Sequence, residues 1–483
     1  METNVQSNIV IAGTSHLTKR PHDTPCNVIE LMCEATQRAA EDAGNDAILS
    51  VVDQIIVPQG TWTINNPGGL VAQHLGIQAK SITYDVGILQ SSLIKRAIED
   101  VNAAKSRCTL IVGGEAKDYE RNVSESLHAI PTLSDSRRQE SSEFIQPAEL
   151  PISRYEIDMG FISAPDQYAL IENAYAHAHK LTRESHQELI NNEWEEMARI
   201  ADSIPSSWIR DAHDHLKNNG WGRTIATPYM LHHVTQWNVN QAAAILITTE
   251  DVAEIYSNGS DEFIFPNALI ESNAVIPLSE RRQLHHCNGL HHIKNEYVRL
   301  TGMNPSESQF HELYSCFPIA VRLQRAAFEL GKRPGTITGG MTFAGGPYNN
   351  FMLQGLSQLA KQVRESHTTG VITSVSGMLT KQGLISLSTE QPPSGMYLSD
   401  VSDKTQSRTE RMQIEPEMCG NAKVVSSTVS YSAGAPQVYV LVENHDKQRR
   451  LLISDSDTVI EEFLKSHKIG DTIHISQEGA INL

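Results

Sequence analysis

Short apolar runs alternate with segments of helical periodicity along the first quarter of the chain. Four runs are rich in β-branched residues and bounded by turn residues, which is typical of buried strands: residues 9–13, 54–58, 81–86 and 109–113. Between them, apolar positions recur at helical spacing over residues 28–43 and 67–75. This alternation predicts a parallel or mixed sheet that is covered by helices on its faces.

A second series of the same kind follows later in the chain. The predicted strands are residues 262–265, 310–315, 370–376 and 383–388, the last two forming a hairpin. A further buried strand is predicted at residues 241–248, before this series. The predicted helices lie near residues 286–301 and over 319–330 and 348–365. Two α/β halves of similar plan are therefore expected.

Two regions do not follow this plan. Residues 117–235 are charged, polar and irregular, with one strong helical pattern from residue 166 to about 204. We interpret this region as a large insertion over one face of the sheets, and such insertions usually carry ligand contacts. After residue 392 the alternation predicts a small β-rich, barrel-like domain with strands at 424–431, 437–443, 450–454 and 472–476 and a helix at 459–466.

Charge and composition restrict the function. The formal net charge of −18 disfavours a nucleic-acid or anionic-membrane surface, so a ligand that carries phosphates needs a local basic patch or a helix N-terminus. The six cysteines contain no CxxC pair, which argues against a disulfide framework or a zinc ribbon. With no signal-peptide pattern and no apolar run of about 18 residues, a cytoplasmic protein that does not span a membrane is expected.

Three motifs stand out in the second half of the chain. Residues 312–318 read ELYSCFP, residues 339–350 read GGMTFAGGPYNN, and residues 374–377 read SVSG, followed by LTK at 379–381. Supporting segments lie at 30–32, 39–44, 66–72 and 238–244. Their order and spacing resemble the thiolase superfamily, in particular the thiolase-like, acetyl-CoA acetyltransferase-like branch with an extra C-terminal β domain. In that comparison the three motifs stand where thiolases carry NEAF, GHP and CxG.

The resemblance implies an overall architecture. It is the five-layered αβαβα thiolase fold, in which two similar halves bury central helices and a loop domain holds coenzyme A. The expected division is an N-terminal half at 1–116 with 236–260, a loop-domain insertion at 117–235, a C-terminal half at 261–392 and a β-rich domain at 393–483.

The resemblance also shows what this chain lacks. A thiolase carries its nucleophilic cysteine at a helix N-terminus, where the helix dipole lowers the thiol pKa. That position falls near residues 86–90, which read VGILQ. Ser91 and Ser92 are weak substitutes, and a polar helix turn is the simpler interpretation. The second catalytic cysteine, in the CxG position, corresponds to Val375, which cannot transfer a proton.

The remaining candidates for catalysis are hydrogen-bond donors. Tyr314 stands at the NEAF asparagine, where its phenol can donate to a carbonyl oxygen. Gly346 replaces the GHP histidine, and the backbone N–H groups of the Gly345–Gly346 turn can bind an anionic or carbonyl group. Gly377 keeps the backbone N–H that helps to form an oxyanion hole in the family, although a glycine in a tight turn explains it equally, and Ser376 beside it can hold a water.

Several other residues have two interpretations. Cys316, the thiol nearest the expected pocket, is either a buried structural cysteine or a relocated nucleophile or acyl acceptor. His285, His286, Cys287, His291 and His292 form a cluster, which we interpret as solvated histidines in preference to a metal site. The candidate contacts to substrate or coenzyme A are Gly87, Gly340, Gly345, Pro347 and Asn349.

The sequence therefore predicts a protein that handles acyl-CoA thioesters without a covalent acyl-cysteine. Coenzyme A or acyl-CoA is expected as substrate or ligand, with no permanently bound cofactor. The alternative is an inactive coenzyme A-binding carrier, sensor or partner subunit. A homo-oligomer or a complex with a thiolase-type subunit is the expected assembly. A third hypothesis makes the C-terminal β domain the working part and the α/β core its scaffold.

Overall fold

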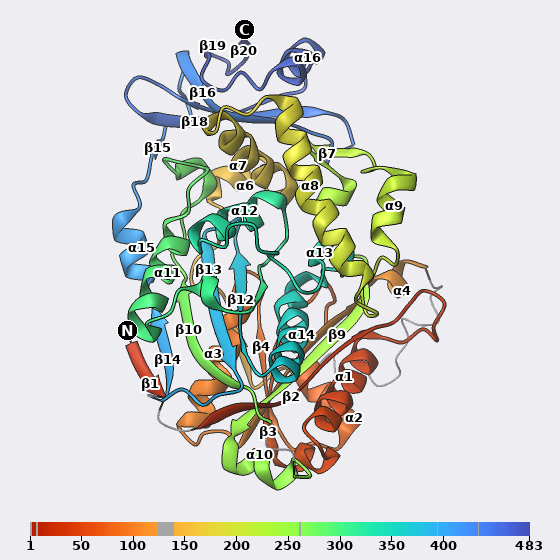
Figure 1. The fold of residues 1–483 in the computed structure, drawn as a ribbon. Helices are drawn as coiled ribbons and strands as arrows, with labels where there is room; N and C mark the ends of the chain where they lie inside the picture. Colours follow the sequence, from red (N-terminus) through yellow and green to blue (C-terminus); the bar gives the residue numbers. More distant parts are fainter. Residues whose placement is uncertain (1, 6–7, 123–139, 260–261, 394, 433) are drawn as a thin grey trace.

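The first half of the molecule is built on a six-stranded mixed sheet. The computed structural model describes residues 2–5, 8–122, 140–259, 262–393, 395–432 and 434–483 (Figure 1). In sheet order the strands are β2 (Ile9–Thr18), β9 (Asn240–Thr249), β5 (Cys108–Ala116), β3 (Val52–Pro58), β4 (Lys80–Tyr84) and β6 (Glu143–Ile145). Strand β9 pairs antiparallel with both β2 and β5, and β5 pairs parallel with β3.

The second half repeats this plan. Its sheet runs β1 (Glu2–Val5), β14 (Met396–Asp400), β10 (Phe265–Ser272), β13 (Lys381–Ser388), β12 (Thr369–Ser376) and β11 (Phe310–Glu312). Strand β13 pairs antiparallel with β10 and β12, and β12 pairs parallel with β11. The sequence β10-β13-β12-β11 thus reproduces the directions of β2-β9-β5-β3, which confirms the two similar halves expected from the sequence.

Two helices lie between the sheets. They are α3 (Gln90–Asn102) and α14 (Phe351–Ser366). Their buried side chains, such as Ile94 and Leu356, share one apolar core with Ile245 of the first sheet and Ile385 of the second. Both helices therefore contact both sheets through their buried apolar sides.

Outer helices complete five layers. The first sheet is covered by α1 (Val28–Asp42), α2 (Pro67–Leu75) and α10 (Glu250–Tyr256), and the second by α11 (Asn288–Thr301), α12 (Pro318–Ala327) and α15 (Ser402–Arg408). Helix α1 begins with a capping box, in which Asn27 and Glu30 each accept a backbone N–H from the other residue. The αβαβα order predicted from the sequence is confirmed (Figure 1).

The insertion is mainly helical and packs over the second half. Its helices are α4 (Lys117–Asn122), α6 (Arg154–Asp158), α7 (Ala164–Ala178), α8 (Arg183–Asp202) and α9 (Ala212–Asn219), with short strands β7 (Thr224–Ala226) and β8 (Tyr229–Met230). The single helix predicted over residues 166–204 is wrong. Lys180 adopts a φ of 54°, and Thr182 then caps a new helix by accepting the Ser185 N–H. Part of the insertion, residues 123–139, lies outside the described residues.

The C-terminal region forms a third sheet above the insertion (Figure 1). Its strands run β15 (Gln413–Ile414), β18 (Gln448–Ser454), β17 (Gln437–Glu443), β16 (Gly420–Ser430), β19 (Thr472–Ile475) and β20 (Ile481–Asn482), with α16 (Asp457–Lys465) against them. The predicted β-rich C-terminal region is confirmed, but its predicted barrel-like closure is not seen in the part of it that the structure describes. Among the described residues the strand pairs form an open path, and β7 of the insertion adds to it through β16.

Two boundaries differ from those read in the sequence. The strand predicted at 262–265 is β10, which begins at Phe265 and extends to Ser272. A register shift between Pro266 and Ala268 interrupts the apolar pattern, and Glu271 near its end is a buried charge that the pattern does not mark as strand. Strand β14 pairs with β10 in the second sheet, so the division at residue 393 separates it from the sheet in which it lies.

Candidate functional site

The two central helices begin side by side, and one glutamine joins them. Gln90 is the first residue of α3 and is only 3% exposed. Its Oε1 accepts the N–H of Met352 at 2.6 Å, and its Nε2 donates to Asn349 Oδ1 at 3.4 Å. The side chain of Gln90 therefore caps the N-terminus of α14, where a helix otherwise leaves N–H groups without partners. No thiol lies in this segment, because residues 85–92 contain no cysteine.

Tyr314 lies at this junction. Its backbone N–H donates to Thr373 Oγ1 at 2.8 Å, and its ring meets Phe351 edge to face with centroids 6.0 Å apart. Burial raises the pKa of the phenol well above its ordinary value, although a hydrogen bond from Gln90 opposes the shift. The phenol is therefore protonated at neutral pH and can donate a hydrogen bond.

Side chains of the ELYSCFP motif hold the glycine-rich motif and the two residues before it in place. The Glu312 carboxylate accepts the N–H groups of Ile337 and Thr338 at 2.8 and 3.0 Å. Ser315 Oγ accepts the N–H of Met341 at 3.0 Å. The two motifs are thus coupled for a structural reason, since the first supplies the acceptors that fix the backbone of the second.

The Gly345–Gly346 turn already forms a hydrogen bond within the protein. The Gly346 N–H donates to the carbonyl of Gln236 at 2.9 Å, so the prediction that it is a free donor for a ligand is wrong. A Cβ at Gly346 would lie 2.3 Å from Thr235 Cγ2, and one at Gly345 would lie 2.4 Å from Gln241 Oε1. Both glycines are therefore required by close packing against the end of the insertion and the start of β9.

The other predicted ligand contacts are dispersed. Gly340, with a φ of +75°, faces Met197 of helix α8 and Ser315, so it serves domain packing. Pro347 is buried directly before Tyr348. Asn349 reaches the junction through its bond to Gln90. Of these, only Asn349 is joined to the Tyr314 junction by a hydrogen bond found among the described residues.

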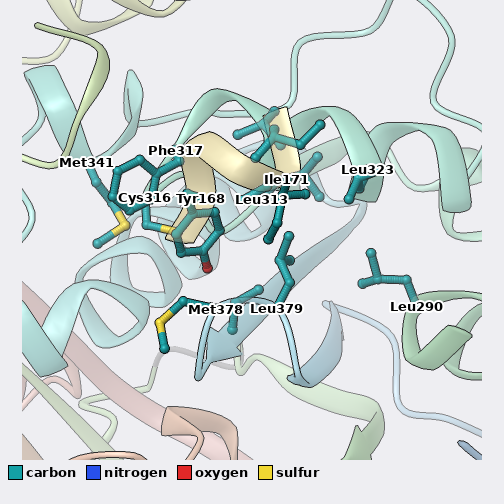
Figure 2. Close-up of a cluster of buried hydrophobic side chains, with 14 of the residues drawn as sticks. Tyr168, Ile171, Leu290, Leu313, Cys316, Phe317, Leu323, Met341, Met378 and Leu379 are labelled. Atoms are coloured by element: carbon teal, nitrogen blue, oxygen red, sulfur yellow. The ribbon is translucent and has the colours of Figure 1, made fainter. Parts of the chain in front are cut away.

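Cys316 is a buried thiol in an apolar cluster. Figure 2 shows its side chain beside Tyr168 and Phe317, with Met341 and Met378 nearby. Burial raises its pKa to about 12, although a hydrogen bond from the Tyr168 hydroxyl opposes the shift. A thiol so far from ionisation is a poor nucleophile at neutral pH, which favours the structural interpretation of this cysteine.

The turn of the SVSG motif lies against the segment that precedes α3. Gly377 has a φ of +60°, and a Cβ there would lie 2.3 Å from Pro151 of the insertion. A Cβ at Gly87 would lie 3.8 Å from the same proline, and the Gly87 carbonyl accepts Lys381 Nζ at 2.9 Å. Pro151 thus covers the Gly377 turn, in which Ser376 is half-buried. Lys381 also lines a hollow of about 320 Å³ beside residues 145–149.

An aromatic pair stands exposed near the junction. Trp237 and Tyr348 are 44% and 38% exposed, with ring centroids 6.2 Å apart, and Lys117 Nζ lies 5.9 Å from the tryptophan ring. Tyr348 directly precedes Asn349 and lies near Glu115, whose pKa burial raises to about 7 against hydrogen bonds from Thr61. We call Lys117, Trp237 and Tyr348 the aromatic mouth. Sequence reasoning missed it because its members are more than 100 residues apart and only Tyr348 stands within one of the three motifs.

Ser91 and Ser92 form hydrogen bonds within the core. Both hydroxyls donate to the Glu271 carboxylate of β10, the Ser92 bond measuring 2.9 Å, and Ser91 Oγ lies 2.7 Å from Ser374 Oγ. Burial raises the pKa of Glu271. Ser91 is fully buried, so these contacts tie α3 to the second sheet and support the structural interpretation of the two serines.

The histidine cluster contains ordinary polar contacts, and the interpretation of its members as solvated is wrong for His292, which is only 9% exposed. His286 and His291 stack with ring centroids 4.8 Å apart, and His292 Nδ1 lies 3.1 Å from Thr405 Oγ1. In the described part of the chain, no three His, Cys, Asp or Glu side chains are placed to hold a metal ion. Over the same residues, no helix has both the length and the apolar character needed to cross a membrane.

Solved structures with the same architecture include three informative neighbours. A monomeric SCP2-thiolase like protein type 1 from Mycobacterium smegmatis matches 97% of this chain and 96% of its own, with 20% identity and a TM-score of 0.78. The Ltp2-ChsH2(DUF35) aldolase matches 80% of this chain and 100% of its own, with 16% identity and a TM-score of 0.59. Human mitochondrial 3-ketoacyl-CoA thiolase in complex with CoA matches 80% and 99%, with 13% identity and a TM-score of 0.55. No protein-family model and no curated protein sequence matches the chain.

These likenesses define the class of fold. The chain has the thiolase-superfamily fold, as the three motifs predicted. The M. smegmatis structure corresponds to nearly the full length, which includes the C-terminal sheet, whereas the other two correspond to four-fifths of the chain.

Proposed function

We propose that this protein binds coenzyme A thioesters where α3 and α14 begin, and that it forms no covalent acyl-cysteine. The observation that carries the proposal is Gln90. At the start of α3, the side chain of a glutamine bonds to Met352 and Asn349, and no thiol is present there. A site of this kind can hold a thioester by hydrogen bonds, but it has no group to accept the acyl chain.

Features of the site support a coenzyme A ligand. Tyr314 offers a protonated phenol at the junction. The aromatic mouth offers Trp237 and Tyr348 as apolar contacts and Lys117 as a cation for the phosphates. The neighbouring fold in human mitochondrial thiolase is known in complex with CoA. In a chain with a net charge of −18, a local cation of this kind is required for a polyanionic ligand.

Binding without turnover is the better supported form of this proposal. A thioester reaction needs donors aimed at the developing oxyanion. Here the Gly346 N–H is used by Gln236, and Pro151 covers the Gly377 turn. The protein therefore acts as an acyl-CoA carrier, sensor or partner subunit, either as a homo-oligomer or with a thiolase-type partner.

Calorimetric titration with coenzyme A and acetyl-CoA tests the proposal. We expect both to bind, and Tyr314→Phe to weaken acetyl-CoA about tenfold while coenzyme A binding stays unchanged, because only the acyl carbonyl needs the phenol. Arg38→Gln, on the outer helix α1, is the matched control. The proposal would be refuted by an acylated cysteine detected by mass spectrometry. It would also be refuted if neither coenzyme A nor acetyl-CoA bound.

Direct transfer of the acyl group to water is the second candidate. It is favoured by the protonated Tyr314 phenol, which can stabilise a carbonyl oxygen without a covalent intermediate. A time course of free thiol release from acetyl-CoA and acetoacetyl-CoA distinguishes the two. Steady release that is abolished in Tyr314→Phe supports turnover, whereas binding with no release supports the carrier.

A further inference from the structure

A second polar hollow lies apart from the thioester site. It has a volume of about 330 Å³ and is lined by the N-terminus of α11, the turn between β12 and β13, and the end of α15. Leu379 and Thr380 of the turn line it, whereas the next residue, Lys381, lines the hollow near Gly87. The turn therefore separates the two spaces.

Arg281 is a buried charge at this hollow. It is 8% exposed, and its Nε donates to the Ile276 carbonyl at 3.0 Å, but its Nη2 has no hydrogen-bond partner. The nearby carboxylate of Glu156 accepts the N–H groups of Ser279 and Ser153. Burial lowers the pKa of Arg281, opposed by Cys287, Glu156 and Tyr168. A buried guanidinium with an unused nitrogen is costly unless an anion compensates it.

Two further arginines line the same hollow. Arg408, at the C-terminus of α15, is exposed, and no carboxylate pairs with it in the described ranges. Arg282 pairs with Glu410, which is the one carboxylate among the lining residues. Three arginines thus face one glutamate in a chain whose net charge is −18, so the hollow is a local positive region.

A helix N-terminus opens on the same space. Cys287, Asn288 and Gly289 begin the 14-residue helix α11 and line the hollow, and Cys287 makes no side-chain cap bond. The partial positive charge of a helix N-terminus adds to that of the arginines. Asn288 Nδ2 donates to Thr409 Oγ1 at 3.0 Å, which fixes the end of α15 beside the helix start.

We propose that this hollow is a binding site for a small phosphate-bearing anion, held by Arg281 and Arg408 at the N-terminus of α11. The planar guanidinium group matches phosphate in a bidentate geometry, and Arg281 and Arg408 both line the hollow. The site is independent of the thioester site, and its occupation stabilises the junction between α11, α15 and the second sheet.

Titration of the full chain with inorganic phosphate tests the site, with sodium chloride at matched ionic strength as the reference. We expect phosphate to raise the melting temperature beyond the chloride reference and Arg408→Gln to weaken binding about tenfold, because one charge-assisted bond is lost. Arg408 is exposed, so this variant leaves the core intact. Arg38→Gln is the control and is expected to bind as the wild type does.

Cys287 gives a second readout that does not depend on stability. It is half-buried and lines the hollow, so bound phosphate is expected to slow its alkylation at least threefold, while the exposed Cys419 reacts at an unchanged rate. Equal protection of both cysteines, or phosphate binding that is the same in Arg408→Gln and Arg38→Gln, overturns the proposal. Absence of a phosphate effect beyond chloride overturns it as well.

Discussion

Single polar side chains buried between domains fix how the insertion sits on the core. Glu172 of α7 has no exposed surface and is bonded by His186 Nε2 and the Tyr229 hydroxyl, each at 2.8 Å, and by the Arg322 guanidinium. Arg322 belongs to α12 and also reaches Glu193 of α8 at 2.6 Å. This cluster of ion pairs and hydrogen bonds joins the insertion to the second half, and removal of one partner leaves a buried charge unpaired.

The charge of Glu172 predicts a pH dependence. Burial alone would raise its pKa, but Arg322 and His186 lower it to about 2, below the ordinary value of 4.5. Its contribution to stability is therefore complete above pH 4.5 and is lost as the pH falls toward 2. We expect Glu172→Gln to cost about 3 kcal/mol at pH 7, measured by urea unfolding, and the difference from wild type to shrink between pH 4.5 and 3. A difference that stays constant over that range contradicts the assignment.

Cys316 is expected to be inert. With a pKa of about 12, only about 1 in 100,000 of its thiols is ionised at pH 7. In a time course with iodoacetamide read by mass spectrometry, the exposed Cys419 should react first and Cys316 should stay unmodified in the folded protein. Cys316→Ala should bind acetyl-CoA as the wild type does. Rapid labelling of Cys316 would instead support the hypothesis that it is a relocated nucleophile.

At the scale of elements, we expect Glu312 to hold the start of the glycine-rich segment in place. Its carboxylate accepts two backbone N–H groups and the hydroxyls of Thr336 and Thr338. Glu312→Gln removes one acceptor oxygen and should cost about 2 kcal/mol, with faster hydrogen exchange at Ile337 and Thr338. Glu365→Gln, on the exposed side of α14, is the control and should leave both exchange rates unchanged. Unaltered exchange in Glu312→Gln would show that packing alone fixes the segment.

The sequence predicted most elements because each carries its own periodicity and end signals. Asn66, Pro67 and Gly76, for example, mark both ends of α2. It failed where tertiary contacts decide. Residues 178–183 are helical in composition, yet the helix is interrupted there and Lys180 adopts a positive φ. The use of the Gly346 N–H by Gln236 depends on how the insertion returns to β9.

The same distinction holds for the site. Tyr314 could be proposed because it stands in a local motif, and its phenol lies beside Gln90. Gln90 itself, the aromatic mouth and the buried Arg281 were not predicted. Each acquires its meaning from partners distant in the chain, as Gln90 does from Met352 and Asn349, and a single sequence does not encode that proximity in any local pattern.

At the scale of the whole molecule, the C-terminal sheet is part of one packed body. Tyr439 and Leu451 belong to the same apolar cluster as Phe161 of the insertion. Asn173 of α7 donates to the carbonyl of Ser427 at 2.8 Å. Because the interface is both apolar and hydrogen-bonded, we expect the sheet to unfold together with the core.

Arg449 provides the sharpest test of that coupling. It is 2% exposed, and its guanidinium donates to the carbonyls of Arg281 and Arg282 at 3.0 and 2.9 Å, outside its own sheet. Arg449→Leu leaves both carbonyls without their donors and should cost about 3 kcal/mol. The neighbouring Arg450→Leu is the matched control, because Arg450 bonds to Met418 within the C-terminal region.

Spectroscopy distinguishes joint unfolding from separate unfolding of the C-terminal sheet, because all five tryptophans precede residue 393. Tryptophan fluorescence then follows the core and the insertion, which holds Trp194, Trp208 and Trp221, whereas circular dichroism follows the whole chain. The two unfolding curves should coincide in the wild type and in Arg450→Leu, and should separate in Arg449→Leu as the C-terminal sheet unfolds first. Separate curves already in the wild type would show that the C-terminal sheet is an independent domain, and they would return the third hypothesis, that this domain works on its own, to first place.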